Sequence, residues 1–185
     1  MYSLEDIEKE IKNCKKCRLW KSRKNPVVGD GSIDAEIMFI GEAPGKNEDE
    51  QGKPFVGKAG QFLNDVLKEN GIERGDVYIT NVVKCRPPNN RDPLPDEIEA
   101  CSPYLEKQIE IIKPKIIVTL GRFSTKFILS LYGFKNEPIS KIHGKIFSSP
   151  LNGIKIIPMY HPAACIYNPA LKEVFKNDIK KLAKF

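Results

Sequence analysis

Four cysteines are the residues of this 185-residue chain whose type and spacing point most directly to chemistry. Cys14 and Cys17 form a C-x-x-C pair near the start, and Cys85 and Cys101 follow far downstream. Together they supply four thiolates, the number that a tetrahedral zinc ion or an iron–sulfur cluster needs. The spacing does not separate these two, and four reduced thiols partly buried in the core are the alternative. The fifth cysteine, Cys165, has no evident partner, so we favour a ligand set over disulfides.

Polar residues follow three predicted strands at the point where each strand ends. The segment GEAPG (41–45) and then Glu48 follow the first strand, Asn81 lies at the end of the second, and His161 follows the third. If the strands are parallel, their carboxyl ends meet at one edge of the sheet, which is where ligands bind in such folds. We therefore expect a carboxylate, an amide and an imidazole to converge on one crevice.

Each of these residues has a structural alternative when it is taken alone. GEAPG could be only a tight turn, and Asn81 could cap its own strand end. Phe55 lies between two glycine-containing turns, where its ring could pack in the loop or stack on a planar base in a cleft. His143 precedes a glycine in a predicted turn, and we expect it to be structural. The convergence of several such residues is a stronger indication than any one of them.

Strands and helices alternate along the chain, and this order predicts the fold. Apolar runs predict strands at 35–40, 77–83 and 115–120 and a strand pair at 145–159. Periodic apolar positions predict helices up to about residue 13, at 59–69, 96–112 and 124–131, and from 170 onward. The alternation predicts an α/β fold of three layers (αβα), with a central, mostly parallel twisted sheet between helices. We expect residues 1–185 to form one domain, with residues 1–25 as an arm that carries the C-x-x-C pair.

The charge and hydropathy of the chain restrict its partners and location. The chain has 30 basic and 24 acidic residues, a net charge of +6 at pH 7. This excess fits a polyanion such as nucleic acid, although lysine-rich surfaces are often only solvated. The sequence has no apolar secretory segment and no run of 18 apolar residues. We therefore expect a soluble, cytoplasmic protein that does not contact membranes.

Several motifs occur in order along the chain and together resemble a known family. GEAPG with its following acidic run, GKPFVGKAG (52–60), TNVVKCRPP (80–88) and HPAA (161–164) accompany the four cysteines. This combination resembles the family 4 uracil-DNA glycosylases, the iron–sulfur branch of the uracil-DNA glycosylase superfamily, from about Cys14 to about Pro169. The resemblance implies the αβα fold of that superfamily and a [4Fe–4S] cluster on the cysteines. It also implies a DNA repair enzyme that hydrolyses the N-glycosidic bond of uracil in single- or double-stranded DNA and leaves an abasic site.

The resemblance also implies roles for individual residues. Asn81 would donate to uracil O4 and accept from N3–H, whereas cytosine presents the reverse pattern. Phe55 would stack on the base after it has been flipped out of the duplex, and Gly41 would border that site. Glu48 would fill the space beside C5 and so disfavour thymine. His161 would hydrogen-bond to uracil O2 and stabilise the negative charge that develops on the departing base.

The water that attacks the sugar needs a partner, and the resemblance does not supply it directly. Ala43 stands where the best-known relatives in the superfamily carry an Asp. The adjacent Glu42 is therefore the first candidate for positioning or polarising the water. Asn90, in the loop that follows Cys85, is the second candidate.

Contacts with DNA are expected on either side of the crevice. Arg86 and Arg91 flank a Pro/Asn loop, where they would bind phosphates. Ile166 and Tyr167 follow His161 at the place where relatives insert an apolar wedge into the base stack, with core packing as the alternative for Ile166. We expect a monomer. Two other functions stay open: a non-catalytic nucleic-acid-binding module of the same fold, and an electron-transfer iron–sulfur or zinc protein.

Overall fold

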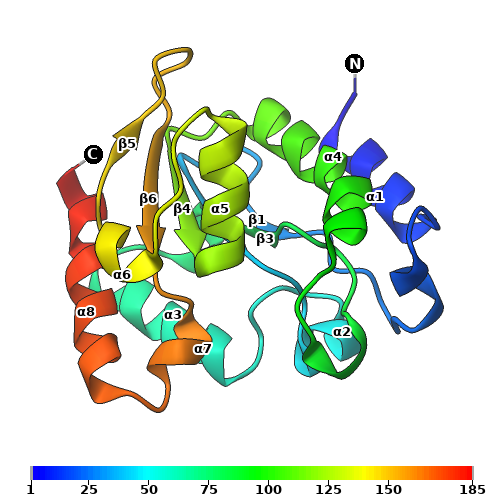
Figure 1. Ribbon diagram of the computed structural model, residues 1–185, viewed down its shortest axis with the longest axis horizontal. Coiled ribbons are helices and arrows are strands. Elements are labelled where there is room, and N and C mark those ends of the chain that lie inside the picture. Colours follow the sequence, from blue (N-terminus) through cyan, green and yellow to red (C-terminus); the bar gives the residue numbers. More distant parts are fainter. Residues whose placement is uncertain (1, 185) are drawn as a thin grey trace.

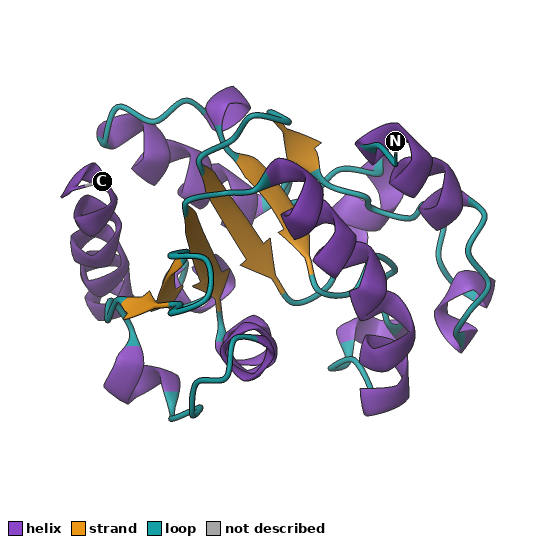
Figure 2. Ribbon diagram, turned by 90° about the horizontal axis from the view of Figure 1, so that it is seen from above, coloured by secondary structure: helices purple, strands orange, loops and turns teal. Residues whose placement is uncertain are grey.

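A six-stranded sheet forms the centre of the computed structural model, which describes residues 2–184. Helices cover both faces of the sheet (Figures 1 and 2). The strand order is β1-β3-β2-β4-β6-β5; β2, β3, β4 and β6 run parallel, and the edge strands β1 and β5 run antiparallel to their neighbours. The strands span Asp30–Gly31, Ile37–Gly41, Tyr78–Asn81, Ile116–Leu120, Phe147–Ser148 and Lys155–Met159, β1 to β6 in that order. The predicted three-layer fold with a mostly parallel sheet is confirmed.

The inner strands carry apolar side chains on both faces, as strands covered by helices on both sides do. In β2, Met38 and Ile40 belong to the core on one face, and Phe39 belongs to the core on the other. In β4, Ile117 and Val118 divide between the two cores in the same way. Because both faces are buried, these segments are continuous apolar runs rather than alternating ones.

The helices divide between the two faces of the sheet. α1, α4, α5 and α6 contribute to the core on one face, and α3, α7 and α8 to the core on the other. The helices α1 to α8 span Leu4–Lys12, Lys46–Gln51, Lys58–Glu69, Pro95–Ile112, Arg122–Leu131, Ile139–Ile142, Pro162–Cys165 and Pro169–Ile179. Short 3-10 turns occupy Arg18–Lys21, Arg74–Asp76, Pro88–Asn90 and Lys180–Lys184. Over residues 2–184, none of the helices is both long and apolar enough to cross a membrane.

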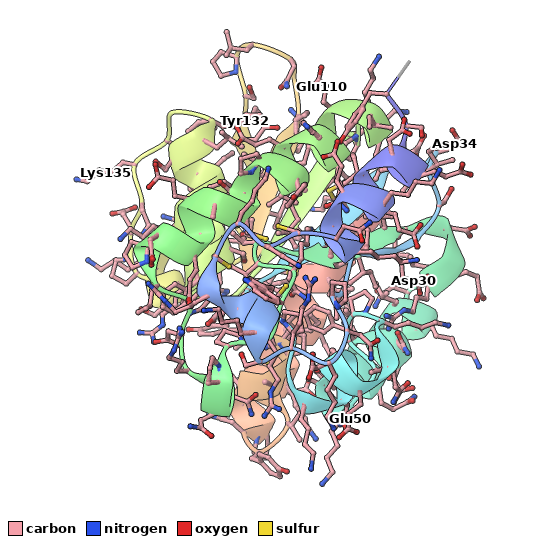
Figure 3. All side chains as sticks on the ribbon, turned by 90° about the vertical axis from the view of Figure 1, so that its right-hand side faces the viewer. Asp30, Asp34, Glu50, Glu110, Tyr132 and Lys135 are labelled. Atoms are coloured by element: carbon pink, nitrogen blue, oxygen red, sulfur yellow. The ribbon has the colours of Figure 1, made fainter. Side chains whose placement is uncertain are left out.

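The N-terminal arm crosses one side of the molecule, which faces the viewer in Figure 3. Helix α1 begins at a capping box, in which the Asp6 N–H donates to Ser3 Oγ (3.2 Å), and it packs against α4. The far end of the arm is bound to α2, because Asp49 Oδ1 accepts from the backbone N–H groups of Lys24 (2.9 Å) and Asn25 (3.3 Å). The arm is therefore fastened at both ends.

The strand predicted at 77–83 ends earlier than its apolar pattern suggested. β3 ends at Asn81, and the N–H groups of Val82 and Val83 donate to the carbonyls of Gly41 (2.9 Å) and Glu42 (3.0 Å). These bonds hold the chain beside the end of β2 as it turns toward Cys85. They place the two strand ends of the expected crevice next to each other.

Candidate active site

A pocket lies at the carboxyl ends of β2, β3 and β6, the edge of the sheet where the sequence predicts a crevice. It contains about 500 Å³ of space not occupied by atoms, part of it open to solvent. Its walls are formed by Ala43, Gly45, Glu48, Phe55, Ala59, Asn81, His161 and Ala163. The predicted convergence of a carboxylate, an amide and an imidazole is confirmed, and the roles of these residues in binding stay predictions.

Gly41 allows the Asn81 amide and the Phe55 ring to approach each other. Gly41 and Asn81 are register partners at the ends of β2 and β3, and Asn81 is buried. A Cβ on Gly41 would lie 2.5 Å from Asn81 Oδ1 and 2.8 Å from Phe55 Cζ. Any larger residue at this position would therefore push the amide and the ring apart.

His161 is a neutral hydrogen-bond donor at the pocket. Its Nδ1 accepts the N–H of Ala163 (3.0 Å), and a ring nitrogen that accepts carries no proton, so the proton lies on Nε2. Desolvation lowers the pKa of His161 to about 4, and the nearby Glu48 opposes this shift only in part. The imidazole is therefore neutral at pH 7. The ring of Phe55 stacks on it, with centroids 5.4 Å apart.

The carboxylate of Glu48 fixes the loop that follows it. Oε1 accepts the N–H of Gly45 (3.1 Å), and Oε2 accepts the N–H groups of Val56 (3.0 Å) and Gly57 (3.1 Å). Glu48 thus lines the pocket and also holds the segment that carries Phe55. Its predicted position beside C5 of the base stays a prediction.

Glu42 lies half-buried next to two residues that the sequence reasoning did not identify, Asp92 and Arg122. Desolvation raises the pKa of Glu42 to about 7, Asp92 raises it further, and Arg122 opposes the shift. Arg122 also pairs with Asp92, with Nη2 and Oδ2 3.4 Å apart. A carboxyl with this pKa can accept a proton near neutral pH, in agreement with the role predicted for Glu42. Asp92 and Arg122 are distant from Glu42 in the sequence, and no motif marks them.

Three predicted site residues in the loop after β3, Arg86, Asn90 and Arg91, form contacts within the protein. Asn90 Oδ1 accepts from Arg86 Nε (2.8 Å), so its amide oxygen already has a donor. Arg91 forms two bonds with Glu97, from Nη1 to Oε1 and from Nη2 to Oε2, each 2.8 Å long. This pairing, which the sequence did not predict, gives Arg91 a structural partner. The water-positioning role of Asn90 and the DNA-binding roles of both arginines stay predictions.

The two residues predicted as a wedge follow α7 and differ in exposure. Ile166 is partly buried, whereas Tyr167 is 81% exposed. An exposed aromatic side chain close to the pocket is available for contact with a ligand. Of the pair, Tyr167 is the more exposed, and the wedge role of both residues stays a prediction.

The four cysteines predicted as ligands surround a second cavity, between the N-terminal arm, the turn after β3 and α4. The space between them is nearly filled, with a volume of only about 10 Å³ open to the centre of a water molecule. Its wall includes Cys14, Cys17, Cys85 and Cys101, all as free thiols. Arg23 Nη1 donates to Cys85 Sγ (3.0 Å) and the Lys84 N–H donates to Cys101 Sγ (3.2 Å). Cys165 belongs to the core on the opposite face of the sheet.

These four thiols supply the donor set that an iron–sulfur cluster or a tetrahedral zinc ion needs. Burial raises the pKa of Cys101 to about 12, so this thiol needs a cationic ligand to lose its proton. A zinc ion would take all four thiolates, whereas a cluster would divide them among its iron atoms. Within the described part of the chain, no three His, Cys, Asp or Glu side chains form a group that could hold a metal ion. The [4Fe–4S] cluster therefore stays a prediction.

Lys84 is a buried charged residue that the sequence reasoning missed. Its Nζ donates to Thr80 Oγ1 (2.5 Å), to the Asn81 carbonyl (2.8 Å) and to Gln108 Oε1 (2.6 Å). Desolvation lowers its pKa to about 7. These bonds join the end of β3 to α4 directly below Asn81. A single lysine within the apolar run VVKC is the signal that could have revealed it.

Comparison with known proteins agrees with this architecture. Residues 28–183 match the uracil DNA glycosylase superfamily. A type-4 uracil-DNA glycosylase of Sulfurisphaera tokodaii is 57% identical over 185 residues, which cover 98% of this chain and 84% of that protein. A protein of the same name from Saccharolobus solfataricus is 55% identical, and the alignment covers 98% of this chain and 86% of that protein. One from Archaeoglobus fulgidus is 50% identical, and the alignment covers 100% of this chain and 94% of that protein. On the strength of a match that spans most of its length, the chain belongs to the uracil-DNA glycosylase superfamily.

Proposed function

We propose that the protein is a monofunctional uracil-DNA glycosylase, a DNA repair hydrolase that releases free uracil from DNA and leaves an abasic site. The observation that carries this proposal is the pocket in which the Asn81 amide, the Phe55 ring and the Nε2–H of His161 lie together. Relatives that are 50–57% identical over nearly the whole chain are named type-4 uracil-DNA glycosylases. Their name and this pocket indicate the same reaction.

Recognition requires that the base leave the helix, because its edge and its glycosidic bond are inaccessible within the stack. In the pocket, Asn81 donates from Nδ2 to uracil O4 and accepts at Oδ1 from N3–H. Cytosine presents a donor and an acceptor in the opposite order, so the same amide would be mispaired with it. Phe55 provides the stacking surface that replaces the neighbouring bases.

Cleavage breaks the bond between C1′ and N1, and its electron pair leaves with the base. The Nε2–H of His161 donates to O2, where the negative charge accumulates, and this stabilises the transition state electrostatically. The sugar passes through an oxocarbenium-like state. Water then adds to C1′, and its proton passes to the Glu42 carboxylate, whose pKa of about 7 makes it a competent acceptor near neutral pH.

Substrate DNA would lie across the pocket, between the loop after β3 and the segment after α7. Arg86 contributes positive charge on the first side, and the exposed ring of Tyr167 lies on the second. The net charge of +6 favours such binding and makes affinity fall with increasing salt. We propose Tyr167, with Ile166 behind it, as the wedge that fills the space left by the flipped base.

The four cysteines would hold a [4Fe–4S] cluster. When bound, it would supply Fe–S bonds that join the arm of residues 1–25 to the turn at Cys85 and to Cys101 on α4, with no electron passed in the reaction. The cysteine cavity and the N–H···S bonds to Cys85 and Cys101 support this assignment. We regard residues 1–185 as one functional domain. The monomeric state and the cytoplasmic location stay predictions.

The decisive test is incubation of the protein with a uracil-containing oligonucleotide, followed by alkaline cleavage of abasic sites. We expect strand breaks that depend on uracil and fall by at least about 100-fold in His161→Ala, because one lost charge-stabilising donor costs roughly that factor. Glu42→Ala should lower the single-turnover rate and leave DNA binding intact. Binding of uracil-containing DNA without release of the base would contradict the enzyme and identify a non-catalytic module instead.

A further inference from the structure

The backbone of Phe55 adopts a conformation that an aromatic residue avoids. Its φ angle is 49°, in the left-handed region, where a Cβ lies too close to the backbone and the conformation is strained. Such conformations persist only where the surrounding structure imposes them, and they cluster at functional sites. Phe55 is 6% exposed, and its ring lines the pocket. Neighbouring segments must therefore hold the Phe55 backbone in this conformation.

Arg74 binds the carbonyl side of this segment. Its Nη1 donates to the Phe55 carbonyl (2.8 Å) and to Asn64 Oδ1 (2.8 Å), and its Nη2 donates to the Pro54 carbonyl. The guanidinium is planar and its donors lie in a fixed fork, so two successive carbonyls are held in one orientation. Arg74 lies in the 3-10 turn that precedes β3, and only 22% of its side chain is exposed.

Two other elements restrain the same segment from different directions. Glu48 accepts the N–H groups of Val56 and Gly57, so the amide side is fixed from α2. A Cβ on Gly60 would lie 1.8 Å from the Phe55 carbonyl oxygen, which shows how closely the first turn of α3 approaches. Glu48 binds the N–H groups that follow Phe55, and Gly60 contacts its carbonyl through packing alone. Among these three residues, only Arg74 binds the Phe55 carbonyl with a charged side chain.

We propose that Arg74 is a positioning residue for base binding, which keeps the Phe55 ring against the pocket by holding the carbonyls of Pro54 and Phe55. The inference rests on the proposed function, because it assigns Arg74 to the stacking step of that reaction. Arg74 does not line the pocket and touches no reacting atom. Without its two carbonyl bonds, Phe55 can relax to a negative φ, which rotates its Cα–Cβ bond and moves the ring away from Asn81.

The test uses variants at position 74 and a matched control in the full-length protein. In Arg74→Gln the single-turnover rate of uracil release should fall by about 10- to 100-fold, the range expected when hydrogen bonds from a charged group are lost. Arg74→Lys keeps the charge but not the fork, and we expect an intermediate loss. Asp30→Asn is the control; Asp30 lies at the surface (Figure 3) with its carboxylate 4.0 Å from Arg74 Nε. It leaves both carbonyl bonds in place and should change the rate by less than about twofold.

A double-mutant cycle separates positioning from general stabilisation. Phe55→Ala removes the ring, so Arg74→Gln in that background should cost no more than about twofold further. Binding of DNA that already contains an abasic site should be unchanged in Arg74→Gln, because that product offers no base for stacking. Equal losses of rate on both backgrounds, or a parallel loss of abasic-DNA affinity, would overturn the inference.

Failure of the inference and failure of the proposed function give different results. If the wild-type protein releases no uracil, the proposed function is wrong. If the wild-type protein releases uracil and Arg74→Lys and Arg74→Gln do so at the same rate, only the role of Arg74 is wrong. Should Arg74→Gln not fold, Arg74→Lys on the wild-type and Phe55→Ala backgrounds completes the same cycle and decides between the two outcomes.

Discussion

At the scale of single residues, the site contains two titratable side chains with opposite roles. Desolvation lowers the pKa of His161 to about 4, which keeps its ring a neutral donor, and raises the pKa of Glu42 to about 7, which makes it a proton acceptor. Environments that push two pKa values in opposite directions assign the electrophilic and basic roles. In the proposed reaction, His161 donates a hydrogen bond to the departing base, and Glu42 accepts a proton from the attacking water.

The rate of uracil release should therefore rise with pH around neutrality. Glu42 is active when ionised, so single-turnover rates should increase as the pH rises through about 7. Asp92→Asn removes a negative neighbour that raises this pKa, so the midpoint should move to lower pH. Glu42→Gln should be slow and show no such step. An unchanged midpoint in Asp92→Asn would contradict the coupling of the two carboxyls.

Substitution of Asn81 by Asp should change which base is accepted. The carboxylate accepts from the cytosine amino group but repels uracil O4, where the amide donated. We expect the uracil rate to fall by at least about 100-fold and the ratio of cytosine to uracil release to increase. Alkaline cleavage of matched oligonucleotides that contain either base measures both rates. A proportional loss on both bases would argue that Asn81 does not read the base edge.

At the scale of elements, one buried carboxylate joins three segments near the site. The Glu97 side chain is fully buried and pairs with Arg91 of the loop after β3 and with Arg18 of the N-terminal arm. Its Oε1 also accepts the N–H of Leu94 (2.9 Å) at the start of α4. Hydrogen bonds from Arg91, Leu94 and Arg18 lower the pKa of Glu97 to about 2 against the cost of burial. Glu97 therefore links the arm, the loop after β3 and the helix.

Glu97→Gln should destabilise the protein in a pH-dependent way. Breaking a buried ion pair costs about 3–5 kcal/mol, which corresponds to a fall in Tm of about 10 °C for a chain of this size. Because the folded-state pKa is lowered, the stabilisation is present above about pH 4.5 and is lost as the pH falls toward 2.

Thermal unfolding of the wild-type protein and of Glu97→Gln as a function of pH measures the difference in Tm between them. The difference in Tm between the two proteins should be largest above about pH 5 and should decrease at lower pH. The matched control is Glu99→Gln on the exposed face of the same helix, which should leave Tm within about 2 °C. A gap that stays constant down to pH 3 would show that the charge of Glu97 is not the cause.

The elements also show which parts of the structure can be predicted from the sequence. The helices at 59–69 and 96–112 and the strand at 115–120 were predicted to within a residue or two, because their apolar patterns are long and regular. Helix α2, with the sequence KNEDEQ, has no apolar face and depends on the capping contacts of Glu48. The buried charges Lys84 and Glu97 each also have a partner from a distant segment, Gln108 and Arg18 respectively, which no local pattern predicts.

At the scale of the whole molecule, the cysteine cavity lies where the arm, the turn after β3 and α4 meet. Cys85→Ser should abolish the brown absorption and the bound iron of the proposed cluster. Tm should fall by at least about 5 °C, because metal-site binding energy contributes to folding energy. The control is Cys165→Ser, a buried cysteine in the other core, which should retain iron. Full iron content in Cys85→Ser would rule out the proposed ligand set.

The edges of the sheet have a consequence for the protein in concentrated solution. The strands at both edges, β1 and β5, contain two residues each. An edge strand can recruit a strand of another molecule only along its free N–H and C=O groups, and here that row is very short. The parallel strands, with their long apolar runs, are enclosed between these two edges. Each edge strand therefore offers a neighbouring molecule only a short row of free backbone groups, which disfavours strand pairing between molecules at high protein concentration.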